Sequence, residues 1–326
     1  MASRINTLMR GMGERSDART GLFFILIAVL GYSMLPVFTH YLGEGGMQPL
    51  DIAVWRYLFA APVFWILMQS PAFARGAGDS TIAPKRLPRT PLFLMGILLA
   101  AAALAAFYGL RLIPAGTFVV IFYTYPAMVA LLMLLFGERL SIWGWAAIGM
   151  TLVGIALTAP DFSAGLRGDN LSGVLLSLLN AFIVAIYFIL NGRVLRGHNR
   201  LGLASAWTVT GTLFFLLLIV PFNGLTLPQG TTWLYLIGLA TFSTVMPIFA
   251  LTNGIVKAGA TRASLFGTIE PLITALFAQW FIGQAMQPIQ WLGGIIIIMS
   301  VVLLQLFGSI KTLDSTKSDD RLETKT

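Results

Sequence analysis

Long apolar runs alternate with short polar connections along most of the chain. Ten of these runs approach the length of about 20 residues that a helix needs to cross the hydrocarbon core of a bilayer. We expect the spans at residues 21–42, 51–70, 91–111, 115–136, 142–160, 171–192, 203–222, 232–255, 262–282 and 289–308. The third and fourth spans are separated by Arg111 and Pro114, which interrupt one long apolar stretch. The pattern therefore predicts an all-α polytopic membrane protein with ten transmembrane helices.

The second half of the chain repeats features of the first. Pro126 and Pro271 lie about 145 positions apart, each inside an apolar run that ends at a glycine. Trp55 and Trp207 lie at matching places in the second run of each half. Because five spans per half is an odd number, the second half must enter the membrane from the opposite side to the first. The sequence thus predicts two inverted five-helix repeats, an architecture in which a transporter's substrate site lies near the bilayer midplane, where the halves meet.

Four regions follow from this division. We expect an N-terminal tail at 1–20, the first repeat at 21–160, the second repeat at 171–308 and a C-terminal tail at 309–326. Both tails are polar and mixed in charge, which is typical of flexible ends. The first apolar run is not followed by a small-residue cleavage site, so we interpret it as a transmembrane helix and not as a signal peptide.

Composition supports a membrane protein and excludes several kinds of chemistry. The chain is 57% hydrophobic and 10% charged, whereas a soluble globular domain carries about 25% charged residues. It contains no cysteine, which excludes disulfides, thiolate metal sites and cysteine nucleophiles. The sequence also shows no zinc-binding, phosphate-binding or serine-nucleophile motif. We therefore expect no metal, no cofactor and no enzyme activity.

The 21 Lys and Arg residues are distributed unevenly over the predicted topology. Eighteen lie on the side of the N-terminus, whereas Arg111 and Arg167 lie on the other side and Arg56 lies inside the second span. Cytoplasmic connections carry the excess of basic residues, so both termini are predicted to be cytoplasmic. We expect a multi-pass protein of a bacterial cytoplasmic (inner) membrane, with no nucleic-acid partner despite the net charge of +8. Monomer and homodimer remain alternatives.

Several motifs resemble the drug/metabolite transporter superfamily, in its EamA-like branch. They are Ile113-Pro114-Ala115-Gly116, Tyr125-Pro126, Gly137-Glu138-Arg139, Ala263-Ser264-Leu265, Ile269-Glu270-Pro271-Leu272, Phe281-Ile282-Gly283-Gln284 and Gln290-Trp291-Leu292-Gly293. The resemblance covers about residues 20 to 308. It implies two EamA-type repeats and secondary transport of small organic solutes, with members that export amino acids and others that take up metabolites. Gln284 stands where the family often has Glu, and because this motif lies at a helix end we interpret it as structural.

Glu270 is the first candidate for the mechanism. It lies about eight residues into the ninth span, roughly 12 Å along a helix that rises about 1.5 Å per residue. A carboxylate near the midplane is costly unless it is paired, hydrated or protonated, so such acids commonly bind substrate or a coupling proton. The structural alternative is that Glu270 accepts hydrogen bonds and holds neighbouring helices together.

Arg56 is the second candidate, about five residues into the second span. Its guanidinium stays charged, so it can contact an anionic group of a substrate. The alternatives are a pair with Asp51 and an anchor that reaches the headgroup region.

Other polar and aromatic residues within the apolar runs are candidates for a substrate cavity. They are Tyr32, Ser33, Tyr108, Tyr123, Tyr125, Asn180 and Tyr187. Four prolines inside predicted spans remove a backbone donor and favour bends that a gate can use. They are Pro36, Pro126, Pro247 and Pro271. We also expect the alanine run at 100–106, Gly149 and Gly154 to permit close helix packing.

The leading hypothesis is a secondary transporter of a small organic metabolite, an amino acid or a related amphipathic solute, that works by alternating access. Export is favoured over uptake, and protons are a candidate coupling ion through Glu270. Two alternatives come from other classes of protein. A membrane-embedded enzyme would need clustered acids, histidines or cysteines facing one cavity, and a non-transporting scaffold or sensor would need larger soluble regions than these tails.

Overall fold

The computed structural model describes residues 19–70, 73, 86–135, 140–158, 168–195, 198, 200–258 and 266–307. Each of the ten predicted spans coincides with a helix or with a helix broken into two parts. The helices are Arg19–Glu44, whose second part is α2 (Leu35–Glu44), α3 (Pro49–Leu67), α5 (Arg89–Leu94), α6 (Gly96–Leu112), α7 (Ala115–Phe122), α8 (Tyr125–Leu134), α9 (Ile142–Thr158), α10 (Gly168–Val194), α11 (Leu201–Asn223), α12 (Thr232–Ala240), the π-helix η1 (Thr241–Val245), α13 (Met246–Ala258), α15 (Glu270–Ile282) and α16 (Pro288–Phe307).

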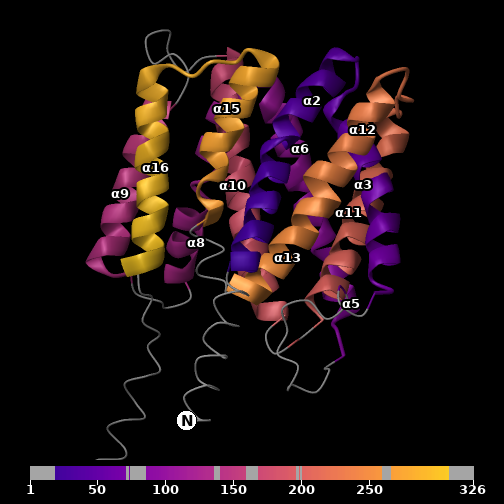
Figure 1. Cartoon of the computed structure of the whole chain (residues 1–326), viewed down its shortest axis with the longest axis horizontal. Helices are drawn as coiled ribbons and strands as arrows, with labels where there is room; N and C mark the ends of the chain where they lie inside the picture. Colours follow the sequence, from indigo (N-terminus) through magenta and orange to yellow (C-terminus); the bar gives the residue numbers. More distant parts are fainter. Residues whose placement is uncertain are drawn as a thin grey trace, which may run out of the picture.

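The lengths of these helices fit a bilayer. Eight helical segments of the described chain are long and apolar enough to cross a membrane, and α9 and α15 are shorter apolar helices. The segments run between two ends of one bundle (Figure 1). We call the end where α2 finishes at Glu44 the upper face, and the end where α16 finishes at Phe307 the lower face. The chain is therefore an all-α multi-pass membrane protein.

Packing between helices repeats across the two halves. The contact of α10 with α6 corresponds to that of α2 with α12, and the contact of α10 with α8 corresponds to that of α2 with α15. Three further pairs join equivalent helices of the two halves, namely α3 with α11, α7 with α15 and α9 with α16. Because five spans separate equivalent helices, the two members of each pair cross the membrane in opposite directions. The fold consists of two inverted five-helix repeats.

Four helices are interrupted in the middle of the bundle. The first span has a turn at Met34, α7 and α8 are separated at 123–124, and α15 follows a turn at 268–269. In each of these three cases a proline is the second residue of the next helix. Proline lacks a backbone N–H, and the first turn of a helix needs no such donor. The eighth span contains the π-helix η1 instead, and Pro247 follows it.

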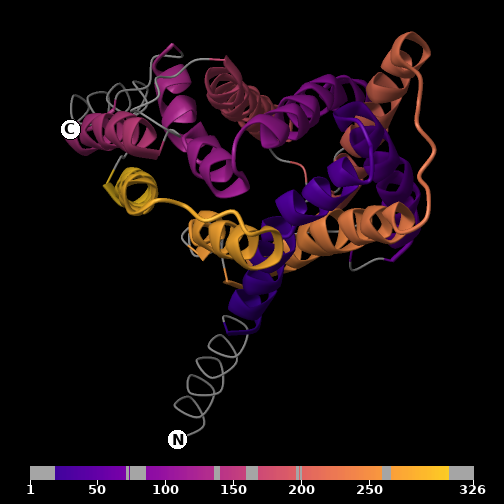
Figure 2. The same ribbon diagram turned by 90° about the horizontal axis from the view of Figure 1, so that it is seen from above.

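The pair α9 and α16 lies at one edge of the bundle in both views (Figures 1 and 2). Small residues allow the two helices to approach closely. A Cβ atom added to Gly154 would lie 2.4 Å from Ile297 Cγ1, and one added to Gly293 would lie 2.4 Å from Thr158 Oγ1. Gly149 makes no such contact, because nothing lies within 4 Å of its Cβ position. A close-packing role therefore holds for Gly154 and is wrong for Gly149, which lies on the open side of α9.

Candidate functional site

A cavity of about 560 Å³ lies between the two repeats. Residues of the first, third, fourth, sixth, eighth, ninth and tenth spans line it. The polar and aromatic members of the lining are Tyr32, Phe118, Phe122, Tyr123, Tyr125, Asn180, Phe188, Thr268, Glu270 and Gln305. Its remaining lining residues are apolar, among them Pro36. A mostly apolar cavity with a few polar groups is typical of a site for a small organic molecule.

Glu270 lies at the start of α15 and faces this cavity. The hydroxyl of Tyr123 donates a hydrogen bond to Glu270 Oε2 at 2.8 Å, and it lies 3.1 Å from the carbonyl oxygen of Gly267. Ser33 donates to the backbone carbonyl of Glu270 at 3.3 Å. An acid in the first turn of a helix is also stabilised by the partial positive charge of the helix N-terminus. The other carboxylate oxygen, Oε1, has no hydrogen-bond partner within the described chain.

The two repeats place different residues at this position. Tyr125 is the first residue of α8 and is followed by Pro126, just as Glu270 is the first residue of α15 and is followed by Pro271. Both Tyr125 and Glu270 line the cavity, whereas neither proline does. Tyr125 and Glu270 therefore occupy equivalent positions of the two repeats, but only the second repeat contributes a negative charge to the cavity.

Aromatic rings surround the carboxylate. Tyr32, Tyr123 and Tyr125 each lie close enough to Glu270 to interact with its charge. The rings of Tyr123 and Tyr125 are 6.0 Å apart between centroids, and Tyr125 lies 5.3 Å from the ring of Phe188. Asn180 is only 6% exposed, and its side chain makes no hydrogen bond to the described residues, so its amide is available to a ligand in the cavity.

Arg56 is not among the residues that line the cavity. Its Nε donates to Thr244 Oγ1 at 2.8 Å and its Nη2 donates to the carbonyl oxygen of Ser243 at 3.4 Å, so it binds the π-helix η1. The guanidinium also lies over the rings of Tyr57 and Phe107, at 5.4 and 5.7 Å. The structure thus places Arg56 as a link between the second, third and eighth spans.

Asp51, the acid considered as a partner for Arg56, has other partners. It accepts hydrogen bonds from the backbone N–H groups of Gln48 and Thr226, each at 3.2 Å. Within the described chain these two residues form no ion pair. Asp51 therefore caps the start of α3 and fixes the connection that follows α11.

The remaining candidates are not among the residues that line the cavity. Ser33 is buried beside Glu270, and Tyr187 lies partly buried next to Phe188, with 6.3 Å between their ring centroids. Tyr108 is 46% exposed on the outside of the bundle, because its position on α6 points away from the core. Pro247 is buried against the first span, where a Cβ atom added to Gly31 would lie 2.5 Å from its ring.

Some lining residues could not be selected from composition alone. Phe118, Phe122 and Phe188 are three of 23 phenylalanines, and their sequence neighbours do not distinguish them. Gln305 carried a usable signal, since it is one of three polar residues in the final helix, with Gln290 and Ser300. It lies two residues before the end of α16, so the cavity reaches toward the lower face.

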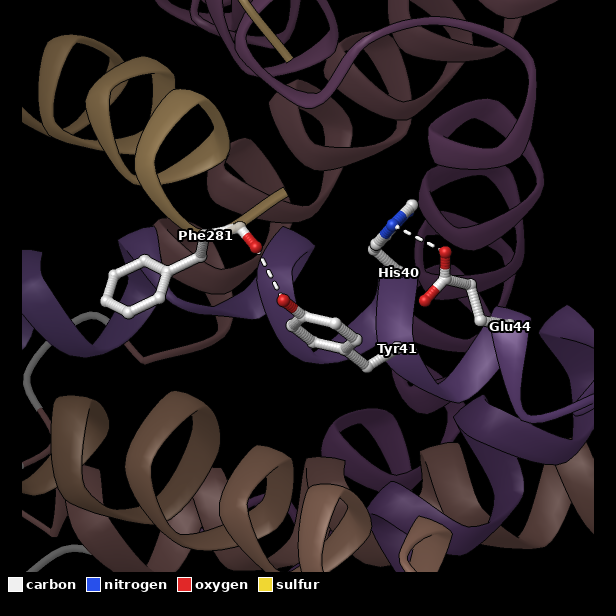
Figure 3. A network of polar contacts seen from close by, with 4 residues as sticks. All are labelled: His40, Tyr41, Glu44 and Phe281. Atoms are coloured by element: carbon white, nitrogen blue, oxygen red, sulfur yellow. Dashed lines mark hydrogen bonds and ion pairs between the residues drawn. The ribbon is translucent and has the colours of Figure 1, made fainter. Parts of the chain in front are cut away.

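At the upper face, the two halves contact each other directly. Tyr41 on α2 donates a hydrogen bond to the carbonyl oxygen of Phe281 near the end of α15, as Figure 3 shows, and its ring stacks on Tyr235 at 5.1 Å. The neighbouring pair His40 and Glu44 lies 3.3 Å apart between Nε2 and Oε1 (Figure 3). These contacts tie the first, eighth and ninth spans together above the cavity.

A second set of contacts joins α7 to α15 and to the connection after it. The backbone N–H of Ala115 donates to Gln284 Oε1 at 2.9 Å. A Cβ atom added to Gly116 would lie 2.8 Å from Met286 Sδ and 3.0 Å from Ala275 Cβ. Gln284 therefore caps a helix of the opposite repeat, which fits a structural role. Its counterpart Glu138 lies outside the described residues.

Comparison with known proteins agrees with this architecture. The family model of the EamA-like transporter family matches residues 19–159 and 171–306. Uncharacterized transporter YcbK of Bacillus subtilis (strain 168) is 25% identical over 293 residues, covering 85% of this chain and 90% of its own. Uncharacterized inner membrane transporter YedA of Escherichia coli (strain K12) is 24% identical over 289 residues, covering 88% and 90%. A solved crystal structure shares the fold, with a TM-score of 0.60, 20% identity and coverage of 89% of this chain and 99% of that chain.

Proposed function

We propose, because this chain belongs to the EamA-like transporter family, that it moves a small amphipathic metabolite, an amino acid or a related solute, across the membrane by alternating access. The family and the relatives named above are transporters, which points away from an enzyme. One observation carries the more specific proposal. The cavity lies where the two inverted repeats meet and contains a carboxylate, three tyrosines and an apolar wall.

The lower face is proposed to be cytoplasmic. Among the described residues, five arginines lie near this face, namely Arg19, Arg86, Arg89, Arg193 and Arg200, whereas Arg111 lies at the upper face. This distribution follows the excess of basic residues on the cytoplasmic side. With this orientation, in the cytoplasmic membrane of a bacterium, the cavity extends toward the cytoplasm and the contacts of Tyr41 and Gly116 close the outer side.

The mechanism requires the two ends to close in turn. The breaks at Met34, at 123–124 and at 268–269 lie beside the cavity, and each leaves one part of a helix able to tilt relative to the other. Opening the upper face would separate α7 from α15 and release Tyr41 from Phe281. We propose Pro36, Pro126, Pro247 and Pro271 as the positions at which these bends form.

Protons are proposed as the coupling ion, with Glu270 as their binding site. A carboxylate inside a membrane protein can be neutralised by a proton or by a bound ligand. If both use Glu270, each turnover exchanges one for the other. An inwardly directed proton gradient would then drive the solute out of the cell, which is why export is the proposed direction.

Flux measurements on purified protein in proteoliposomes test this proposal. A panel of labelled amino acids, amines and small organic acids should include at least one solute that crosses the membrane unchanged, saturably and only when the protein is present. Chemical conversion of the solute would instead indicate an enzyme. Failure of every solute to cross, by folded and correctly reconstituted protein, would contradict the proposed function.

A further inference from the structure

Among the described residues, the carboxylate in the cavity has no positively charged partner. Glu270 is the only charged residue of the described lining. Within the described chain, the one ion pair with atoms closer than 4 Å joins His40 to Glu44 at the upper face. Within the part of the chain that the structure describes, the carboxylate is stabilised by the hydrogen bond from Tyr123 and by the N-terminus of α15. Burying an uncompensated charge is costly, so a cationic ligand would gain free energy here that a neutral or anionic ligand would not.

The rings around the carboxylate favour the same kind of ligand. Tyr32, Tyr123 and Tyr125 come from two spans and all lie within electrostatic range of Glu270. The faces of aromatic rings attract organic cations, and enclosing rings are a recurrent way to bind an ammonium group. Phe118, Phe122 and Phe188 extend the aromatic wall to a second part of the cavity. They provide a surface for an apolar body attached to the cation.

Among the described residues, the positive charge next to the cavity lining belongs to Arg56, and it is bound to the eighth span. Arg56 uses its Nε and Nη2 on Thr244 and Ser243 of η1 and does not line the cavity. A carboxylate on the ligand would thus find no positively charged side chain among the described lining residues. The amide groups of Asn180 and Gln305 are neutral, so they do not change this preference.

We propose that this site selects solutes carrying a cationic amino or ammonium group on an apolar body, with the cation at Glu270 Oε1 and among the rings of Tyr32, Tyr123 and Tyr125. This inference rests on the proposed transport function and specifies its substrate class. An amino group is required, whereas a carboxylate group is not. A proton and a monovalent organic cation are alternative occupants of the same carboxylate, so binding of one releases the other.

Among the described residues, the other titratable groups near this site are tyrosines and one arginine. Tyr32, Tyr123 and Tyr125 lie within electrostatic range of Glu270, and Arg56, Tyr57 and Tyr187 lie within the same range of Tyr32. Glu270 is the one carboxylic acid in this set. A proton released on ligand binding is therefore expected to come from Glu270.

Matched ligands with one apolar body test the charge preference. The purified full chain would be titrated with 2-phenylethylammonium, its N,N,N-trimethyl derivative, 2-phenylethanol and phenylacetate, and binding would be followed by thermal stabilisation and by proton release in weak buffer. We expect both cations to bind, and the trimethyl derivative to bind without donating any hydrogen bond. Equal binding of phenylacetate or 2-phenylethanol, or no binding of either cation, would overturn the proposal.

Variants locate the site. Glu270→Gln should weaken cation binding on the order of a hundredfold or more, as loss of a buried charge partner does, and should abolish proton release. Glu44→Gln, at the upper face, is the matched control and should bind normally. Tyr125→Phe keeps the ring and should retain binding, whereas Tyr125→Leu should weaken it. Unchanged cation affinity in Glu270→Gln would overturn the assignment, and the ligand series on the unmodified chain decides the question if that variant does not fold.

The two proposals fail separately. Specific flux of a neutral or anionic solute, with no preference for cations in binding, would leave the transport function standing and remove the cation site. Selective cation binding that depends on Glu270, without flux of any solute in proteoliposomes, would retain the site and contradict transport.

Discussion

At the scale of single residues, the most consequential feature is the difference between Tyr125 and Glu270. Both are the first residue of a helix that follows a break, both precede a proline and both line the cavity. Only one of them carries a negative charge. If the two halves move past each other as the proposed alternating-access cycle requires, an asymmetric charge at a symmetric position meets different surroundings in each state.

The substitution Glu270→Gln tests the role of that charge in transport. The glutamine amide has nearly the same shape and still accepts the hydrogen bond from Tyr123, but it cannot take up a proton. We expect folded protein in the membrane and transport reduced on the order of tenfold or more, since a missing proton site removes the coupling step. The measurement is solute flux in proteoliposomes over a range of pH.

Its control is Glu44→Gln, which removes a carboxylate that is paired with His40 far from the cavity. Full activity of Glu270→Gln with the wild-type dependence on pH would remove Glu270 from the mechanism. Loss of activity in both variants would show that flux responds to any lost carboxylate.

At the scale of helices, the contact of the first span with η1 depends on Gly31. A Cβ atom added there would lie 2.4 Å from the carbonyl oxygen of Phe242 and 2.5 Å from the ring of Pro247. Because one of these neighbours is backbone, Gly31→Ala should destabilise the protein by about 1 to 3 kcal/mol, the usual cost of overpacking. Thermal unfolding of the purified protein would show a lower transition temperature.

Gly149→Ala is the matched helical control, since its Cβ position is open. It should leave stability unchanged or raise it by up to about 1 kcal/mol, because alanine is the better helix former. Equal stability of the Gly31 and Gly149 variants would contradict the close packing of the first span on η1.

The link between Gln284 and the N-terminus of α7 makes a separate prediction. Gln284→Ala removes the acceptor for the Ala115 N–H and should destabilise the protein by about 1 kcal/mol, as loss of a helix cap does. Gln284→Glu restores the acid that the family often has, retains the acceptor and adds a favourable charge at a helix N-terminus. We expect the Glu variant to be at least as stable as the wild type in thermal unfolding. The opposite order of the two variants would contradict a capping role.

Helix positions were predictable from the sequence because the thickness of the bilayer fixes the length of an apolar span. All ten predicted spans coincide with observed helices, including the division at Arg111 and Pro114. The prolines also marked three of the breaks. The π-helix η1 was not predictable, since nothing in Thr241–Val245 distinguishes it from an ordinary helical turn.

The sequence does not predict how each helix is rotated about its own axis, and hence which of its residues face the cavity. Almost every face of these spans is apolar, so periodicity does not separate the lipid-facing side from the cavity side. Tyr108 and Tyr123 are both tyrosines in apolar runs, yet Tyr108 points out of the bundle and Tyr123 bonds to Glu270. Glu270 was selected from the sequence because a charge at that depth is costly outside a cavity, and in the structure it lines the cavity.

At the scale of the whole molecule, the structure has one closed end. The contacts of Tyr41 with Phe281 and of α7 with α15 join the halves at the upper face, while the cavity lining extends to Gln305 near the lower face. Alternating access requires the upper contacts to open once in every cycle. A bond that holds them closed should therefore stop transport without altering the cavity.

The chain has no cysteine, so a pair of introduced cysteines reports on this contact alone. The Cβ atoms at positions 116 and 275 would lie 3.0 Å apart, which is shorter than the separation of about 3.5 to 4.5 Å in disulfides. The helices must therefore move apart by about 0.5 Å to form the bond, and the single Gly116→Cys variant shows the effect of the added side chain itself. The most direct test of the account is solute flux by the double variant Gly116→Cys, Ala275→Cys in proteoliposomes, oxidised and then reduced, beside both single variants. We predict that flux is lost on oxidation of the double variant only and returns on reduction. Undiminished flux with the disulfide fully formed would contradict alternating access through the upper face.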